Sequence, residues 1–135
     1  MGTKSDLLDS LDPFTKAYLV ASLWSSTDES TPQGGEPLDK NYEIGDFTQE
    51  SLLGAIKDCR AFQADNITLL EQAAEKHGFS IESAGHDFWL TRNGHGAGFW
   101  DRGLENIGYD LTKASKAYGG IDLYVYRGKI YGHEG

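Results

Sequence analysis

Residues 48–77 read TQESLLGAIKDCRAFQADNITLLEQAAEKH and carry the clearest periodic pattern in the chain. Apolar side chains recur every three or four positions from Leu52 to Ala73, which is the period of a helix with one buried face. The Thr48 hydroxyl can cap the first turn, and Gly78 stands where a left-handed residue commonly ends a helix. We therefore predict one helix over 48–77.

The apolar stripe of this helix also predicts which side chains it buries. Leu52, Ile56 and Phe62 lie on the stripe, so we expect them in the core. Cys59 lies there too, and we interpret it as an inert core thiol rather than a nucleophile. Asn66 interrupts the stripe with an amide that should be hydrogen-bonded, and it marks the place where the helix would break.

The preceding part of the chain predicts another helix and a long loop. Asp12 followed by Pro13 is typical of a helix start. Apolar residues then recur at helical spacing to about Ser25, at Phe14, Ala17, Tyr18, Ala21 and Trp24. Residues 26–47 are polar, rich in proline and glycine, and without a period, so we predict a long polar loop there.

After Gly78 the apolar period changes to two, which is typical of strands. Residues 86–91 and 98–101 flank an Asn-Gly turn signal and predict a hairpin. A helix and two strands are expected next, at 109–118, 121–126 and 130–131. The predicted fold class is α+β, in which two N-terminal helices, the second long, precede a ββαββ antiparallel-sheet region within a single domain, 1–135.

The charge of the chain indicates what kind of partner it can meet. Its 135 residues carry a formal net charge of −9 at pH 7. Residues 1–50 hold ten of the 21 acidic side chains but three of the 12 basic ones. Such a field repels nucleic-acid phosphates and favours a basic surface. We therefore expect no direct nucleic-acid binding, and instead a protein partner whose contact surface is basic or itself binds nucleic acid.

Other bulk features bear on the compartment. The single cysteine excludes an internal disulfide and fits a reducing environment. No apolar run approaches the ~20 residues that a membrane-spanning helix needs. The first residues are polar, unlike a signal peptide. We expect a cytoplasmic protein that makes no contact with membranes.

Residues 85–103, GHDFWLTRNGHGAGFWDRG, concentrate the side chains that could carry a function. This segment holds two of the four histidines, two of the three tryptophans and five glycines. Tryptophan and arginine dominate the energetics of protein interfaces, and guanidinium groups suit planar anions. The candidate binding residues are His86, Asp87, Trp89, Arg92, Asn93, His95, Trp100, Asp101 and Arg102.

The same segment resembles a motif in a family of small, mostly uncharacterised proteins of tailed bacteriophages and prophages. The resemblance extends to residues 47–73 and to 123–125, which is about two thirds of the chain. It implies a phage-encoded accessory protein working in the cytoplasm of the host cell. It brings no catalytic residues to carry over.

Metal binding and catalysis are weakly indicated. His86, Asp87, His95 and Asp101 follow no known metal-ligand spacing, so we expect no metal. The run 94–98 lacks the Gly-Lys-Ser/Thr ending of a phosphate-binding loop, and its glycines are interpreted as turn residues. We therefore expect no cofactor and assign no catalytic residue.

Two hypotheses of function follow from these observations. The first is a phage accessory protein that binds a host or phage macromolecule, for instance to inhibit a host defence system. It uses the hairpin and the acidic N-terminal half, and it requires Arg92 and Arg102 to be exposed and dispensable for folding. The second is a protein or small enzyme that binds a nucleotide-like ligand through the His/Asp/Arg cluster of residues 86–102. The sequence leaves the oligomeric state open.

If no metal is needed for folding, thermal melts recorded with and without a chelator should coincide. A structural metal would contribute on the order of 10 kcal/mol to stability, so its removal would lower the melting temperature strongly. A large drop with chelator would contradict this prediction and make ligands of His86, His95 and Asp101.

Overall fold

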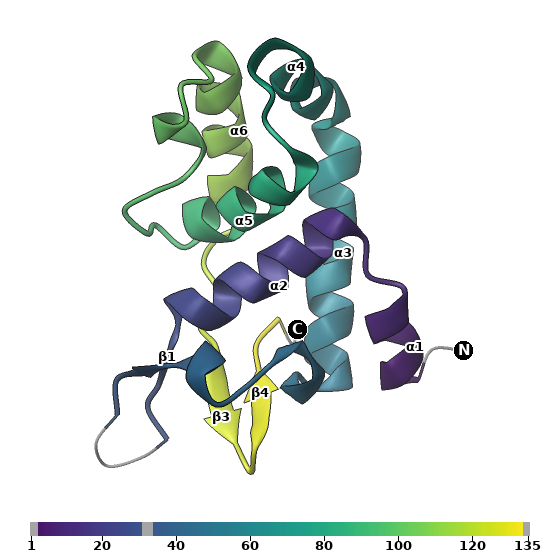
Figure 1. The fold of residues 1–135 in the computed structure, drawn as a ribbon, viewed down its shortest axis with the longest axis vertical. Coiled ribbons are helices and arrows are strands. Elements are labelled where there is room, and N and C mark those ends of the chain that lie inside the picture. The colour runs from purple at the N-terminus through teal and green to yellow at the C-terminus, as the bar shows by residue number, and fades with distance from the viewer. Residues whose placement is uncertain (1–2, 31–33, 134–135) are drawn as a thin grey trace.

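The computed structural model describes residues 3–30 and 34–133, and helices dominate them (Figure 1). The helices are α1 (Lys4–Asp9), α2 (Pro13–Ser25), α3 (Gln49–Asp65), α4 (Ile67–His77), α5 (Ile81–Arg92) and α6 (Asn106–Lys116). Two antiparallel pairs of short strands accompany them: β1 (Thr27–Asp28) with β2 (Glu36–Pro37), and β3 (Tyr124–Tyr126) with β4 (Lys129–Tyr131). Single 3-10 turns cover Leu38–Lys40, Ile44–Asp46 and Phe99–Asp101.

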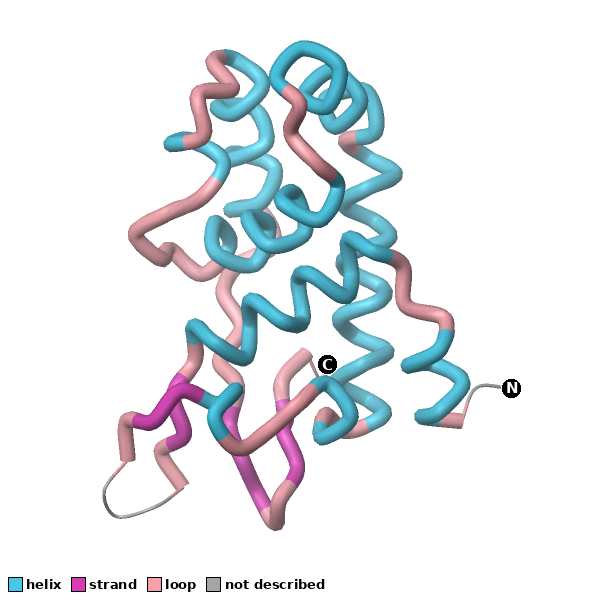
Figure 2. The backbone as a smooth tube through the Cα atoms, in the orientation of Figure 1, coloured by secondary structure: helices cyan, strands magenta, loops and turns pink. Residues whose placement is uncertain are grey.

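The predicted α+β class with a ββαββ region is therefore wrong. Figure 2 shows helix through most of the region where that sheet was expected, and strand only in the two small hairpins. The expected hairpin of 85–103 is instead helix α5 up to Arg92, followed by a loop with a single 3-10 turn. The expected 121–131 strands are present as the short β3–β4 hairpin.

The sequence pattern did not predict helix α5 because this helix is buried on nearly all sides. Every residue from Asp87 to Arg92 is buried, so polar and apolar positions do not alternate with a helical period. Its aromatic and β-branched residues favour strands when they are judged locally. The decisive local signal is Ser80, whose hydroxyl accepts a hydrogen bond from the Ser83 amide and caps the helix.

Helices α2 and α5 cross in the middle of the molecule, one above the other in Figure 1, and they make the most extensive helix contact in the described chain. Their closest approach is at Gly85, where an added Cβ would overlap the carbonyl group of Phe14. Glycine is required here because the two backbones touch, and its φ is ordinary for a helix.

Residues 48–77 are helical as predicted, but they form two helices, α3 and α4, that divide at Asn66, where a break was expected. The single long second helix of the predicted fold class is therefore wrong. Thr48 caps α3, accepting from the Ser51 amide at 3.1 Å, and Gly78 ends α4 in the left-handed region at φ 64°. Asn66 leaves helical geometry at φ −120°, and its side-chain amide donates to the Phe62 carbonyl at 2.9 Å. The expected core residues Leu52, Ile56, Cys59 and Phe62 are all buried.

The earlier part of the chain folds in part as expected, but helix α1, Lys4–Asp9, was not predicted. Asp12 caps α2 through the Thr15 amide at 2.7 Å, and the helix ends at Ser25. The predicted loop 26–47 contains the β1–β2 pair and two 3-10 turns in its described residues. Phe47 is fully buried and bridges to Ile130, which fastens the end of this loop to β4.

A single aromatic stack occupies the centre of the core. The rings of Phe62 and Phe88 lie 4.1 Å apart at 18°, and Phe14 and Tyr18 pack against them from α2. Helix α3 runs most of the length of the molecule, with α4, α5 and α6 toward one end and the hairpins at the other (Figure 1). Among the described residues, no helix has the length and apolar content to cross a membrane.

The close crossing of α2 and α5 makes Gly85→Ala a sensitive test of the fold. We expect the free energy of unfolding to fall by roughly 1–3 kcal/mol, because the new methyl group meets backbone that cannot move aside. Gly96→Ala is the control, since its Cβ would meet open space at an ordinary φ. Urea unfolding measures both. In a helix without such a contact, replacing glycine by alanine raises the free energy of unfolding. An increase for Gly85→Ala would therefore contradict the close backbone contact between α2 and α5.

Candidate functional site

A hollow of about 610 Å³ lies where α2 meets the first turns of α5 and the loop after it. Three of the residues expected to form a site line this hollow: His86 and Asp87 from α5, and Arg102 from the loop. The other lining residues are Ala17, Val20, Phe79, Glu82 and Ser83.

Asp87 organises the polar side of this hollow. Its carboxylate is 1% exposed and accepts two hydrogen bonds from Arg102, Nε to Oδ2 and Nη2 to Oδ1, each 2.9 Å. His86 Nδ1 lies 3.2 Å from Oδ1 of the same carboxylate. Hydrogen bonding to Asp87 raises the pKa of Arg102. A two-point bond of this kind holds the guanidinium in one orientation at the edge of the hollow.

Two exposed apolar side chains of α2 border the hollow. Val20 and Trp24 are 46% and 44% exposed and lie one helical turn apart. The Trp24 ring stacks on His86, with ring centroids 5.4 Å apart at 29°. Since His86 also contacts Asp87, the ring of Trp24 is held in place through two successive contacts.

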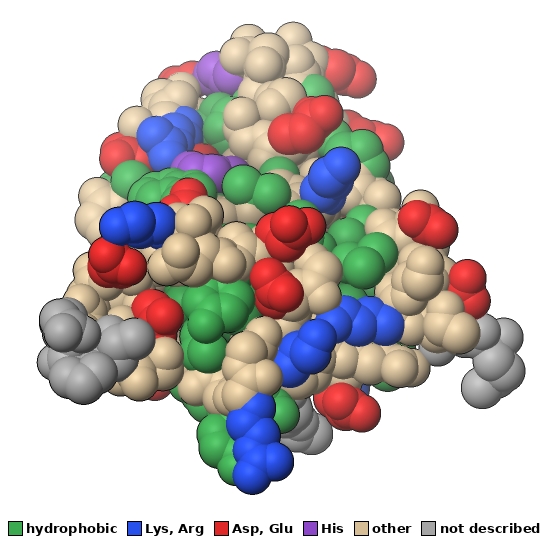
Figure 3. All heavy atoms as spheres, turned by 60° about the horizontal axis from the view of Figure 1, so that its bottom comes forward, with side chains coloured by type: hydrophobic (Ala, Val, Ile, Leu, Met, Phe, Trp, Pro, Cys, Tyr) green, Lys and Arg blue, Asp and Glu red, His purple; other side chains and the backbone are tan. Residues whose placement is uncertain are grey.

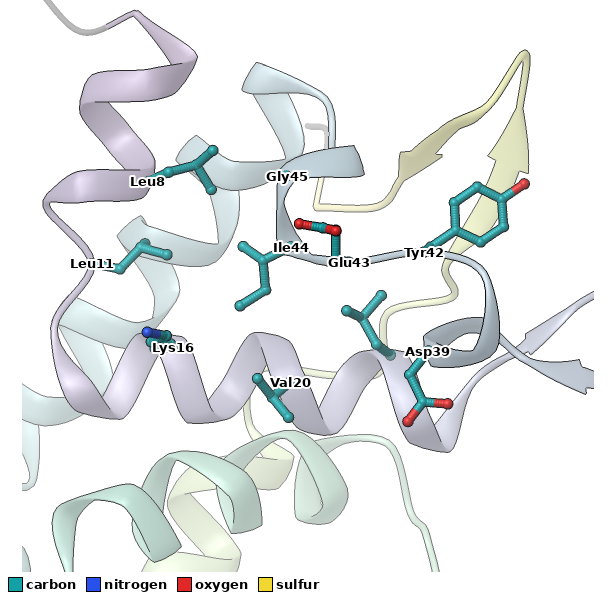
Figure 4. A pocket seen from close by; sticks show the side chains of 10 residues that line it. Leu8, Leu11, Lys16, Val20, Asp39, Tyr42, Glu43, Ile44 and Gly45 are labelled. Carbon is teal, nitrogen blue, oxygen red and sulfur yellow. The ribbon is translucent and has the colours of Figure 1, made fainter.

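Val20 also lines a second hollow, of about 500 Å³, on its other side. Figure 4 shows Leu8, Leu11 and Ile44 around this space, with Val20 at its edge on α2. Charged side chains, Lys16, Asp39 and Glu43, also line it. We call the two hollows, together with Val20 between them and Trp24 one turn further along α2, the α2 surface.

Arg92 is not exposed, as the sequence led us to expect, but belongs to the core. Its side chain is 2% exposed and donates to the carbonyls of Tyr118 and Gly119 at 3.1 and 2.8 Å. Nη1 donates to Asp58 at 2.9 Å and to the Tyr18 hydroxyl at 3.1 Å. The guanidinium therefore joins α5 to α2, α3 and the chain after α6.

Tyr18 continues this buried network. Because its oxygen accepts from Arg92, its hydroxyl hydrogen is available to His133 Nε2, which lies 2.6 Å away. Burial raises the pKa of Tyr18 well above its ordinary value. Sequence reasoning missed the network formed by Tyr18, Asp58 and His133, which come from three distant parts of the chain.

Trp89 and Asn93 also have structural roles. Trp89 is buried, and its indole nitrogen donates to the Ser25 hydroxyl at 2.7 Å. Asn93 donates to the Trp89 carbonyl at 2.9 Å and accepts from the Ile121 amide at 2.7 Å. Both side chains therefore tie the end of α5 to its neighbours.

The remaining candidate residues lie outside the α2 surface. His95 lines a separate hollow of about 380 Å³ beside Ser25 and Ile121. Trp100 is 46% exposed. Asp101 accepts from the Gly98 amide at 3.1 Å and lies 3.7 Å from Arg102. The structure therefore brings His86, Asp87 and Arg102 to one hollow. It brings Trp89, Asn93 and His95 to another, so the nine predicted residues do not form a single site.

The sequence pattern placed Trp24 on the buried stripe of α2 and did not single out Val20. A signal was nevertheless present, because α2 carries more apolar residues than one buried face requires. Phe14, Tyr18 and Leu19 fill the core side. The surplus is exposed on the opposite side of the helix.

Two groups that could take part in catalysis are already engaged or buried. Both oxygens of Asp87 are engaged by Arg102, and the one thiol, Cys59, is fully buried. Burial raises the pKa of Cys59 well above its ordinary value, which keeps it protonated and unreactive. Across residues 3–30 and 34–133, no group of three or more His, Cys, Asp or Glu side chains is placed to hold a metal ion.

The contrast between the two arginines gives a test of these assignments. Arg92→Ala should lower the free energy of unfolding by about 3–5 kcal/mol, because Asp58 and two carbonyls lose their donor. Arg92→Lys should not restore it, since an ammonium cannot reproduce the planar fork. Arg102→Ala should cost about 1–3 kcal/mol. Arg60→Ala, at an exposed position, is the control. The free energies of unfolding of all variants are measured in urea. Equal stability of all variants would contradict the network.

The comparisons with known proteins add no assignment to this geometry. No protein-family model matches the chain. No curated protein matches it, and no solved structure matches it.

Proposed function

We propose that this chain is a bacteriophage accessory protein that binds a basic protein of the host or the phage through the α2 surface. Inhibition of a host defence protein is the specific role that we favour. The observation that carries the proposal is Val20, exposed between two hollows, with the exposed Trp24 one helical turn away and stacked on His86. Single exposed apolar residues are ordinary, but an apolar ridge between hollows is typical of an interaction site.

The geometry of the α2 surface supports tight recognition. Trp24 is fixed by stacking on His86, and Arg102 is fixed by its two bonds to Asp87. Tryptophan and arginine are the side chains that most often dominate interface energies. Because both are already ordered, binding would lose little side-chain entropy.

The charges around the ridge support a basic partner. Asp39 and Glu43 outnumber Lys16 in the second hollow, and Glu82 lines the first beside the paired Asp87 and Arg102. Figure 3 shows hydrophobic side chains on one face of the molecule among both acidic and basic ones. The net charge of −9 adds a long-range attraction for a basic protein and speeds the encounter. Basic surfaces are common in proteins that bind nucleic acid, so an acidic protein can compete with nucleic acid for them.

The phage setting is supported by the resemblance of residues 85–103 to proteins of tailed phages and prophages. Within that motif, His86, Asp87 and Arg102 belong to the α2 surface. These three residues connect the motif to the α2 surface. Arg92, Trp89 and Asn93 hold helix α5, which carries His86 and Asp87, in place.

A second candidate function is binding of a nucleotide-like ligand in the first hollow. Its volume, about 610 Å³, lies in the range of small-molecule sites, and Arg102 and His86 line it. Titration with a nucleoside triphosphate, followed by calorimetry, separates this candidate from protein binding. A heat of binding that the wild-type protein shows and Arg102→Ala lacks would favour the nucleotide-like ligand.

Two tryptophans of equal exposure allow a matched test of the α2 surface. The immobilised protein should capture a lysine- and arginine-rich protein from host lysate and release it as salt rises. Trp24→Ala should weaken that captured partner's binding at least tenfold, because interface tryptophans are commonly hot spots. Trp100→Ala should leave it unchanged.

Surface plasmon resonance with the captured partner measures the affinities, and thermal melts verify folding. Val20→Ala and Leu53→Ala form a second matched pair, because both side chains are about half exposed. If Trp100→Ala or Leu53→Ala abolishes binding while Trp24→Ala and Val20→Ala do not, the α2 surface is not the binding site.

A further inference from the structure

The β3–β4 hairpin presents a row of aromatic side chains on its outer face. Its register sets Tyr124 opposite Tyr131 and Tyr126 opposite Lys129. Residues directly opposite each other in an antiparallel pair share a face, and residues two apart along a strand share it too. Three tyrosines and one lysine therefore lie on the same side of the hairpin.

The other side of the hairpin faces the core. Val125 pairs with Ile130, and Ile130 is fully buried. Val125 is partly buried and packs against the core cluster. These two aliphatic residues therefore anchor the hairpin to the core, and the tyrosine side chains lie on its other face.

The tyrosine rings are exposed and ordered by one another. Tyr124 and Tyr126 are 58% and 53% exposed. The rings of Tyr124 and Tyr131 lie 5.2 Å apart and nearly parallel, at 11°, and Tyr126 meets Tyr131 edge-on at 6.2 Å. Large aromatic groups held in this way on a surface offer flat faces to a ligand.

Two cationic residues lie beside Tyr126, at the end of the hairpin. The Arg127 guanidinium lies 5.2 Å from the centre of the Tyr126 ring, at the turn of the hairpin. Burial and the neighbouring ammonium of Lys129 lower the pKa of Lys4, while Asp46 opposes this effect. Within residues 3–30 and 34–133, neither Arg127 nor Lys129 forms an ion pair with a carboxylate. Figure 3 shows lysine and arginine side chains gathered at the lower end of that view, beside exposed hydrophobic ones.

We propose that the outer face of the β3–β4 hairpin binds single-stranded nucleic acid. Unpaired bases stack on exposed aromatic rings, and neighbouring cations neutralise the phosphates between them. The net charge of the chain opposes such binding, but Arg127 and Lys129 place two cations at the tip of the hairpin, beside the exposed rings.

The aromatic rings favour single strands over the other anionic partners. A duplex keeps its base faces stacked internally, so it would use the cations but not the tyrosines. An acidic peptide would likewise use the cations alone. This surface is separate from the α2 surface, and it involves none of the same residues.

Fluorescence anisotropy of a labelled oligothymidylate of about 12 nucleotides tests the proposal. We expect binding at low salt that weakens by up to about 100-fold when salt is raised tenfold, since two or three phosphates would be neutralised at roughly −0.7 in slope each. Tyr126→Ala should weaken binding at least fivefold, and Tyr126→Phe should retain it because the ring remains. Arg127→Glu should abolish it.

Helix α6 supplies a matched control. Tyr109 is 63% exposed and has the Lys113 ammonium 5.6 Å from its ring centre, which repeats the pair of Tyr126 and Arg127 elsewhere on the molecule. Tyr109→Ala and Lys113→Glu should leave binding unchanged, as should Trp24→Ala on the α2 surface. Thermal melts of each variant establish that it is folded.

Four outcomes would overturn the proposal. These are no binding at low salt, equal affinity for a duplex of the same length, equal affinity for polyglutamate, and binding that Tyr126→Ala does not alter while its melt matches the wild type. Because the assay needs only the purified protein and an oligonucleotide, it is independent of whether the α2 surface has a protein partner.

Discussion

The buried guanidinium of Arg92 is the interaction on which most of this structure depends. A cation is costly to remove from water, and it persists in a core only when acceptors surround it. Here the acceptors come from α2, α3 and the two carbonyls that follow α6, and the rings of Phe88 and Tyr118 lie about 5.5 Å and 5.4 Å from its carbon. Each of these elements must be in place before the charge is satisfied, so the network admits one arrangement of the helices.

Fixing α5 in this way also fixes what it presents on the opposite side. The last residue of α5 is held by the network, while its second turn touches α2 at Gly85. Between these two points the helix has no freedom to rotate, and His86 and Asp87 are therefore directed toward the first hollow. The surface that we propose for binding is rigid because the core beneath it is polar and specific as well as apolar.

The part of the fold that the sequence predicts correctly is the part with one buried face. Helices α2, α3 and α4 begin or end at recognisable caps, Asp12, Thr48 and Gly78. Helix α5 is packed on several sides, so its polar residues Asp87, Thr91 and Arg92 are buried and blur the helical period. Strand propensity then favours the wrong assignment, and tertiary packing overrides it.

The candidate site shows the same division. Composition identified 85–103 as unusual, and three of its side chains do meet at a hollow. Arg92, Trp89 and Asn93 have the same chemical types but bond to partners 26 to 74 positions away, such as Tyr118 and Tyr18. Local spacing contains no information on these partners. For the same reason, a count of apolar residues on α2 could not show which of them, Val20 and Trp24, would remain exposed.

The attachment of the β3–β4 hairpin has a consequence for how quickly the chain folds. Proteins with this much helix usually fold fast, because their contacts join residues that are near in sequence. Here the Gly132 amide donates to Ser51, 81 positions away, and Tyr18 bonds to His133 across 115 positions. The entropy of closing such long loops must be lost before the core gains Ile130. We therefore expect the helices to assemble early and the hairpin to dock late, which makes loop closure, rather than helix formation, the slow step.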